Sequence, residues 1–111
     1  MPEDIRILVI PADVLENMGY RTINPTDLEA MQALVGGHLE TIELRRPPAF
    51  MMVNEDAHTL NLMPNIRATN IVLAHAHVLL NSPILGDCFI TGPVDDDSWQ
   101  SSVPDFWGKV V

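Results

Sequence analysis

The sequence predicts a single small α+β domain, in which an antiparallel or mixed sheet of four to five strands is packed by two helices. Short runs rich in β-branched residues recur at hairpin-length intervals, and residues 24–37 carry a start signal, an apolar stripe and a stop signal for a helix. The chain has 111 residues, which is enough for one domain with one core. We assign residues 1–94 to the α+β domain and residues 95–111 to a C-terminal tail that is first acidic and then aromatic.

The first three elements are a strand, an irregular arm and a helix. Ile5–Ile10 is rich in β-branched residues and is followed by a proline, which predicts a mostly buried strand. Residues 12–23 show no clean period, and we expect a loop or a hairpin arm there. Pro25–Val35 has its apolar residues at helical spacing, with Asn24 as the N-cap and Gly36-Gly37 as the left-handed end. These signals predict an amphipathic helix over Pro25–Val35.

The middle of the chain is predicted to form strands joined by turns. His38–Leu44 and Ala49–Val53 have the composition and alternation of strands. Asn54–His58 has the residues of a tight turn. We therefore expect Thr59–Leu62 to return as the partner strand of a hairpin.

The second helix is predicted to begin after Asn65, whose side chain can cap the first turn, and to run to about Ala76. Residues 71–80 are apolar enough to form a buried strand instead, and periodicity does not decide between the two. Ile84–Thr91 is a clearer strand, in which Gly86 marks a bulge or a close approach.

The composition excludes several classes of partner. Six basic residues against 15 acidic ones give a net charge of −9, whereas nucleic acids and anionic membranes attract basic surfaces. No apolar run approaches the roughly 18–20 residues that span a bilayer, and the acidic start lacks the features of a signal peptide. Cys88 is the single cysteine, so no internal disulfide can form. We expect a cytoplasmic protein without a cofactor, without a nucleic-acid partner and without a membrane partner.

Four blocks of the chain resemble a known family in their residues and their order. They are Leu34–Glu40 with its Gly-Gly helix end, Asn54–Asp56 at a turn, Asn65–Thr69 at a helix start and Ile84–Gly92 at a strand. This arrangement resembles a family of small proteins carried by phages, plasmids and actinobacterial genomes and catalogued as a domain of unknown function. The resemblance covers about residues 5–93 and implies a mobile-element context without an established activity.

The resemblance and the acidic composition favour a non-enzymatic accessory protein that binds a host protein and modulates or inhibits it. The aromatic residues of the tail, Trp99, Phe106 and Trp107, are the candidate partner-binding residues, because tryptophan is enriched at interface hot spots. Two arrangements remain open for this segment. It can fold back over the sheet, or it can serve as a docking arm for a partner or for a second copy in a homodimer.

An alternative is a small-ligand binder or sponge for an anionic nucleotide. Amides at the helix start that follows Asn65 and the guanidinium of Arg67 could converge on a phosphate. The candidate ligand-binding set is Asn65, Arg67, Asn54 and Glu55. Ordinary surface pairing of Arg67 with nearby carboxylates is the competing interpretation.

A third hypothesis is a metal-dependent hydrolase built on His75, His77 and Asp87. On a strand, residues i and i+2 share a face, so both imidazoles could reach one metal ion; on a helix they diverge. Cys88 is expected to be a small buried core residue, because its neighbour Asp87 would raise the thiol pKa and oppose a nucleophilic role.

Overall fold

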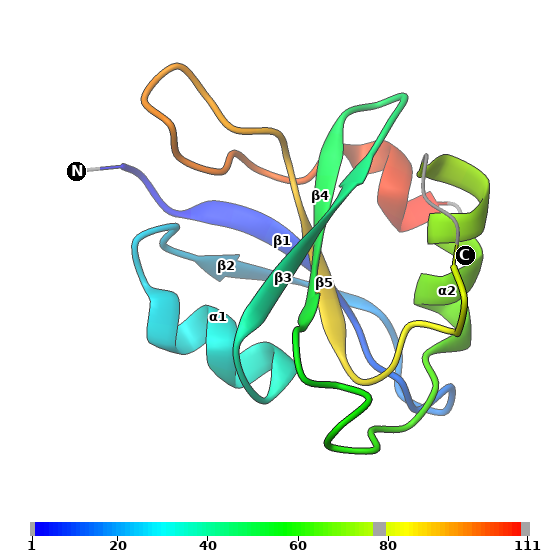
Figure 1. Ribbon diagram of the computed structural model, residues 1–111. Coiled ribbons are helices and arrows are strands. Elements are labelled where there is room, and N and C mark those ends of the chain that lie inside the picture. The colour runs from blue at the N-terminus through cyan, green and yellow to red at the C-terminus, as the bar shows by residue number, and fades with distance from the viewer. Residues whose placement is uncertain (1, 77–79, 110–111) are drawn as a thin grey trace.

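A five-stranded antiparallel sheet forms the centre of the molecule in the computed structural model, which describes residues 2–76 and 80–109 (Figure 1). In chain order the elements are β1 (Ile5–Ile10), β2 (Gly19–Ile23), α1 (Leu28–Val35), β3 (Leu39–Leu44), β4 (Ala49–Asn54), α2 (Ile66–His75), β5 (Cys88–Thr91) and the 3-10 helix η1 (Asp105–Lys109). The strand order is β2-β1-β5-β4-β3, and every pairing is antiparallel. The predicted α+β class with two α-helices is therefore confirmed.

The two faces of the sheet carry separate apolar cores. Alternate residues of β1 point to opposite faces, so that Ile7 packs with α1 while Leu8 packs with α2. The core on the α1 side also contains Met31 and Phe89. The core on the α2 side is larger and includes residues of α2, of β4 and of the C-terminal segment.

The first helix is shorter than predicted. It begins at Leu28, and its N-cap is Asp27, whose side chain accepts a hydrogen bond from the amide of Ala30 at 3.0 Å. Asn24 instead closes a local turn by accepting from the amide of Thr26, and its amide group donates to the carbonyl of Pro2. The prediction that Asn24 caps a helix starting at Pro25 is therefore wrong. Asn24 and Asp27 are both capable of capping a helix, and Asn24 is bound to the N-terminal segment, so Asp27 serves as the cap. Gly36 ends α1 in the left-handed conformation, as predicted (φ 79°).

The predicted hairpin strand at Thr59–Leu62 is also wrong. Residues 55–61 form consecutive turns, in which the amide of Leu60 donates to the carbonyl of Asp56 at 2.9 Å. Asn61 has a positive φ of 54°, a conformation that a strand does not contain. The chain therefore coils from the end of β4 to the start of α2 without adding a strand.

Residues 71–75 of the apolar stretch belong to the second helix, whereas residues 77–79 of that stretch lie outside the described residues. α2 runs from Ile66 to His75, and Asn65 caps it by accepting from the amide of Ala68 at 3.0 Å, as predicted. The final strand is shorter than expected, because Gly86 takes a positive φ of 83° and only Cys88–Thr91 pairs as β5. The arm predicted within residues 12–23 forms the edge strand β2, which pairs with β1 as a hairpin.

The segment after β5 returns to the sheet. The amide of Val103 donates to the carbonyl of Arg6 at 2.8 Å, so this segment lies beside the first half of β1. η1 then places Trp107 in the core on the α2 side, fully buried. Of the two arrangements considered for the aromatic tail, the structure has the folded-back one for Trp107.

Candidate functional site

The side chain of Asn65 makes structural contacts at the end of the sheet where β1 ends and β5 begins. Its side chain is fully buried, and the amide group donates to the carbonyls of Ile10 at 2.9 Å and of Gly86 at 3.0 Å. The side-chain oxygen caps α2. One side chain therefore joins β1, the approach to β5 and the start of α2.

Arg67 extends from the first turn of α2 to the β1–β2 loop. One guanidinium nitrogen, Nη2, donates to the carbonyls of Pro11 at 2.7 Å and of Asp13 at 3.0 Å. Its Nε is buried without a hydrogen-bond partner among the described residues. The guanidinium thus fixes this loop against α2, an arrangement different from the phosphate cradle that the sequence suggested.

Asn54 and Glu55 lie at the same end of the sheet but in a separate environment. Asn54 is buried, donates to the carbonyl of Val35 at 3.0 Å and accepts from the amide of Asp56 at 2.7 Å. Glu55 is exposed beside it. Asn54 and Asn65 bind different main-chain groups, so each of these two side chains has its own structural role.

The metal candidates are far apart where they are described. His75 is the last residue of α2, with its ring 5.0 Å from that of Trp107, whereas Asp87 accepts from the amide of Ala12 near the other end of that helix. A ten-residue helix is about 15 Å long, which separates the two side chains. His77 lies outside the described residues. Among residues 2–76 and 80–109, no group of three or more His, Cys, Asp or Glu side chains could hold a metal ion.

Cys88 is fully buried at the start of β5, as expected. Burial, together with the neighbouring Asp87 carboxylate, raises the pKa of the Cys88 thiol to about 12, while Arg67 opposes the shift. The thiol is therefore protonated at neutral pH and sealed from solvent, which is the environment of a core residue.

The three aromatic residues of the tail have different environments. Trp107 and Phe106 pack edge to face at 5.0 Å between ring centroids, and both contact His75 of α2. Trp107 is fully buried, whereas Phe106 is 39% exposed and Trp99 is 37% exposed. Of these three residues, Trp99 and Phe106 present aromatic surface that a partner could contact directly.

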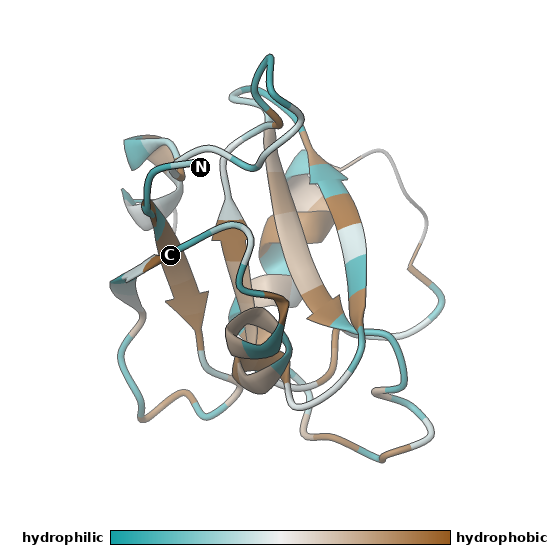
Figure 2. Ribbon diagram, turned by 90° about the vertical axis from the view of Figure 1, so that its left-hand side faces the viewer, coloured by the Kyte–Doolittle hydropathy of each residue, from teal (hydrophilic) through white to brown (hydrophobic). Residues whose placement is uncertain are grey.

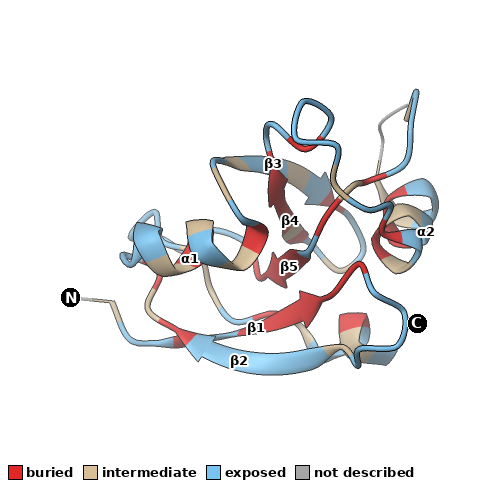
Figure 3. Cartoon of the chain, turned by 90° about the horizontal axis from the view of Figure 1, so that it is seen from below, coloured by how far each residue is buried: buried red, intermediate tan, exposed pale blue. Residues whose placement is uncertain are grey.

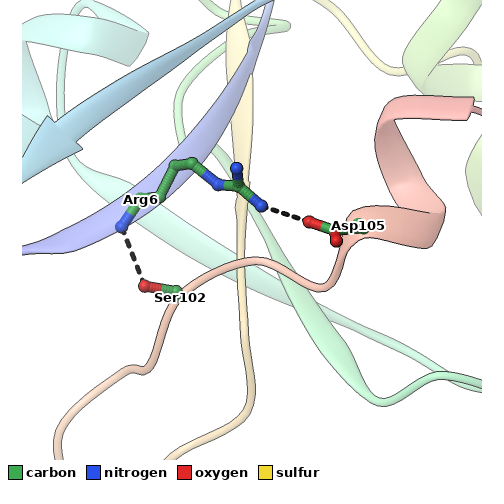
Figure 4. Close-up of polar contacts among 3 residues, drawn as sticks. All are labelled: Arg6, Ser102 and Asp105. Atoms are coloured by element: carbon green, nitrogen blue, oxygen red, sulfur yellow. Dashed lines mark hydrogen bonds and ion pairs between the residues drawn. The ribbon is translucent and has the colours of Figure 1, made fainter.

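A polar anchor holds the tail to β1 (Figure 4). The Arg6 guanidinium forms an ion pair with Asp105, and the Arg6 amide donates to the hydroxyl of Ser102 at 3.0 Å. The same guanidinium lies 4.3 Å from the ring centroid of Tyr20 on β2. Arg6 therefore joins the edge hairpin to the tail, and it does so on the face opposite α1.

A surface hollow of about 700 Å³ lies between the N-terminal segment and the hairpin that precedes the tail helix. Its lining includes Trp99 and the acidic residues Glu3, Asp4, Asp95 and Asp97. One oxygen of Asp95 accepts from the amides of Asp97 and Trp99, so part of this acidic set stabilises the hairpin itself.

A surface that the sequence did not suggest lies at the opposite end of the sheet. Five large apolar side chains are more than half exposed there, on the β1–β2 loop, the β4–α2 loop and the first turn of α2: Val14, Leu15, Leu60, Met63 and Ile66. Arg67 of α2 binds the β1–β2 loop, and Met63 of the β4–α2 loop lines one hollow together with Asp13 and Glu16. Figure 2 shows hydrophobic stretches in the loops at this lower end. We call these five side chains the apolar loop surface. A signal was present in the sequence, since Val14-Leu15 stands between two acidic residues in a stretch without periodicity.

A trough continues from this surface along α1. α1 packs mainly on β3, β4 and β5, and two hollows remain between the helix and the β1–β2 hairpin, with volumes of about 380 and 400 Å³. The hollows adjoin, because Ala33 and Leu34 line both of them. Figure 3 shows the exposed outer strand β2 below the partly exposed helix α1. We call the two hollows together the α1 trough.

The fold and these surfaces define a small two-faced α+β domain with one closed face and one partly open face. The chain belongs to the family described as domain of unknown function DUF3846, whose profile matches residues 5–109. This match confirms the suspected family of unknown function and continues past residue 93 through most of the tail. Comparison with curated proteins and with solved structures gives no match. Within the described residues, no helix is long and apolar enough to cross a membrane.

Proposed function

We propose that this chain is a non-enzymatic binding protein that docks on another protein through its apolar loop surface. The observation that carries the proposal is the exposure of large apolar side chains on adjoining loops, with Leu15 89% exposed at the tip of one of them. Large apolar side chains exposed together at one end of a domain are typical of an interaction site. Binding would bury these side chains and supply the hydrophobic part of the affinity.

The proposed partner is a host protein in the cytoplasm, and the proposed role is to modulate or inhibit it as an accessory product of a phage or mobile element. The family resemblance supports this context, and the net charge of −9 supports a protein partner with basic groups rather than a nucleic acid. Loops set on an antiparallel sheet are suited to this task, and the hydrogen bonds of Arg67 hold the β1–β2 loop in place before binding.

The test is affinity capture from a lysate of the bacterium that carries the gene, with wild-type and variant baits compared side by side. The double variant Leu15→Asp with Ile66→Asp places charge on two members of the apolar loop surface. We expect it to lose specifically captured proteins that the wild type retains. Leu73→Asp, at a 61% exposed position on the outer side of α2, is the matched control and should retain them. Identical capture profiles for all three baits would contradict the proposal.

A further inference from the structure

The α1 side of the sheet is only partly covered by its helix. Neighbouring strands are about 4.8 Å apart, so the outer strands of five are about 19 Å apart, whereas a helix with its side chains is about 10–12 Å wide. One helix therefore covers about half of such a face. α1 lies over the β3–β4–β5 half, and the α1 trough marks the remainder beside β1 and β2.

Both hollows of the trough are partly apolar, and the charged residues that line them differ in sign. Ile23 and Ile7 contribute to the floor of the hollow nearer β2, and of the described residues that line it, Arg21 alone is charged. The other hollow is lined by apolar groups, including Met63, and by the carboxylates of Asp13, Glu16 and Asp87. The lining of this second hollow contains no basic side chain among the described residues.

Two of the three carboxylates in the second hollow are held in place by main-chain amides. One oxygen of Asp13 accepts from the amide of Leu15 at 2.9 Å, and one oxygen of Asp87 accepts from the amide of Ala12 at 2.8 Å. These bonds orient each carboxyl group before any partner arrives. A basic side chain placed there would meet pre-arranged acceptors, which reduces the entropic cost of binding.

We propose that the α1 trough binds one amphipathic helix of the partner protein, with apolar side chains in the two hollows and Lys or Arg over Asp13, Glu16 and Asp87. This inference rests on the proposed function and names the chemistry of the partner segment. A bound helix lies beside α1 as a second helix of the same layer, at the 8–10 Å spacing usual for packed helices. Apolar residues three or four positions apart face the same side of such a helix, which matches two adjoining hollows.

The test begins with selection of a random 16-residue peptide display library on the full chain. We expect the enriched peptides to share two apolar residues at helical spacing, followed within one turn by Lys or Arg. A synthetic peptide of the enriched sequence is then titrated against protein variants by fluorescence anisotropy. Ala33→Arg places a long charged side chain at the junction of the hollows and should weaken binding at least tenfold.

Ala74→Arg is the matched control, because Ala74 is likewise an exposed helical alanine but lies on α2. It should leave the affinity unchanged. Asp13→Asn combined with Glu16→Gln should weaken binding several-fold and reduce its salt dependence, whereas Glu40→Gln combined with Glu43→Gln on β3 should do neither. Circular dichroism melting of each variant checks that the fold is intact.

The proposal is overturned if no peptide is enriched, if the enriched peptides lack basic residues, or if they bind Ala33→Arg as tightly as the wild type. It is also overturned if Trp99→Ala abolishes binding of the enriched peptides, because the acidic hollow beside Trp99 would then be the site. These outcomes leave the proposed function standing, provided that lysate capture still depends on Leu15 and Ile66. Neither of those residues lines the trough, so the two failures are distinguishable.

Discussion

The two faces of the sheet differ in how they are covered. On the α2 side, α2 and the tail helix η1 together enclose a core that contains Leu8, Met51, Ile90 and the fully buried Trp107. On the α1 side, an eight-residue helix covers half of the face and leaves the α1 trough open. This difference suggests that the closed face provides most of the stability and that the open face is available for binding. Substitutions on the two faces test whether stability and binding are separated in this way.

The largest expected effect is at the centre of the closed face. Trp107→Ala should lower the free energy of unfolding by about 3–5 kcal/mol, because it leaves a cavity among α2, the sheet and the tail. Chemical denaturation followed by circular dichroism measures the change. Leu34→Ala is the matched change on the open face, where the side chain is only partly buried and lines the trough; it should cost about 1 kcal/mol or less. Equal losses for the two variants would show that the two faces contribute alike to stability.

The second effect concerns the two asparagines that were predicted to cap helices. Asn65→Ala removes the α2 cap and leaves the buried carbonyls of Ile10 and Gly86 without their donor, so we expect a loss of about 2–4 kcal/mol. Asn24→Ala removes a local turn and the hydrogen bonds from its amide group to Pro2 and Asp4, all outside the core, and should cost about 1 kcal/mol or less. The melting temperatures of both variants measure the two losses. Similar melting temperatures would show that Asn65 does not hold β1, the approach to β5 and the start of α2 together.

These asparagines also show how far the sequence determines the fold. The local signals at Asn65 and Gly36 predicted helix ends correctly, because a cap acts over three or four residues. The prediction for Asn24 failed because Asp27 is a competing cap. Which of the two residues caps the helix depends on the N-terminal segment, which binds Asn24. The strand predicted at Thr59–Leu62 failed for a different reason. An alternating apolar pattern over four residues cannot exclude successive turns.

The candidate site was less predictable than the fold. The position of the β1–β2 loop against α2 depends on Arg67, which contacts residues more than 50 positions away. The α1 trough depends on the position of α1 relative to β2, which no local pattern specifies. The aromatic tail was recognised as significant from composition, but its division into a buried Trp107 and a partly exposed Trp99 required the packed structure.

A third effect tests whether the closed face excludes water, and it is measured as the change in stability with pH. The pKa of Cys88 is raised to about 12 in the folded chain from an ordinary value near 9, so the unfolded chain releases this proton first as pH rises. The stabilising contribution is complete below about pH 9 and is lost between pH 9 and 12, at up to about 1.4 kcal/mol per pH unit. The stability of Cys88→Ala should therefore fall less steeply over this range. Parallel stability curves for wild type and variant would show that the thiol is not sealed.

The smallest effect is expected at the anchor between β1 and the tail. The Arg6–Asp105 ion pair is largely exposed, with side-chain exposures of 44% and 75%, and water and salt weaken such pairs. Asp105→Asn should therefore lower stability by only about 0.2–1 kcal/mol, and the difference should shrink in 1 M NaCl. Glu43→Gln removes the same charge from β3, at the opposite edge of the sheet from β2, and controls for the general relief of negative charge. The cation–π contact of Arg6 with Tyr20 persists in Asp105→Asn, so the hairpin should stay attached. A loss near that of Trp107→Ala would mean that the tail is held by its polar anchor rather than by its buried indole.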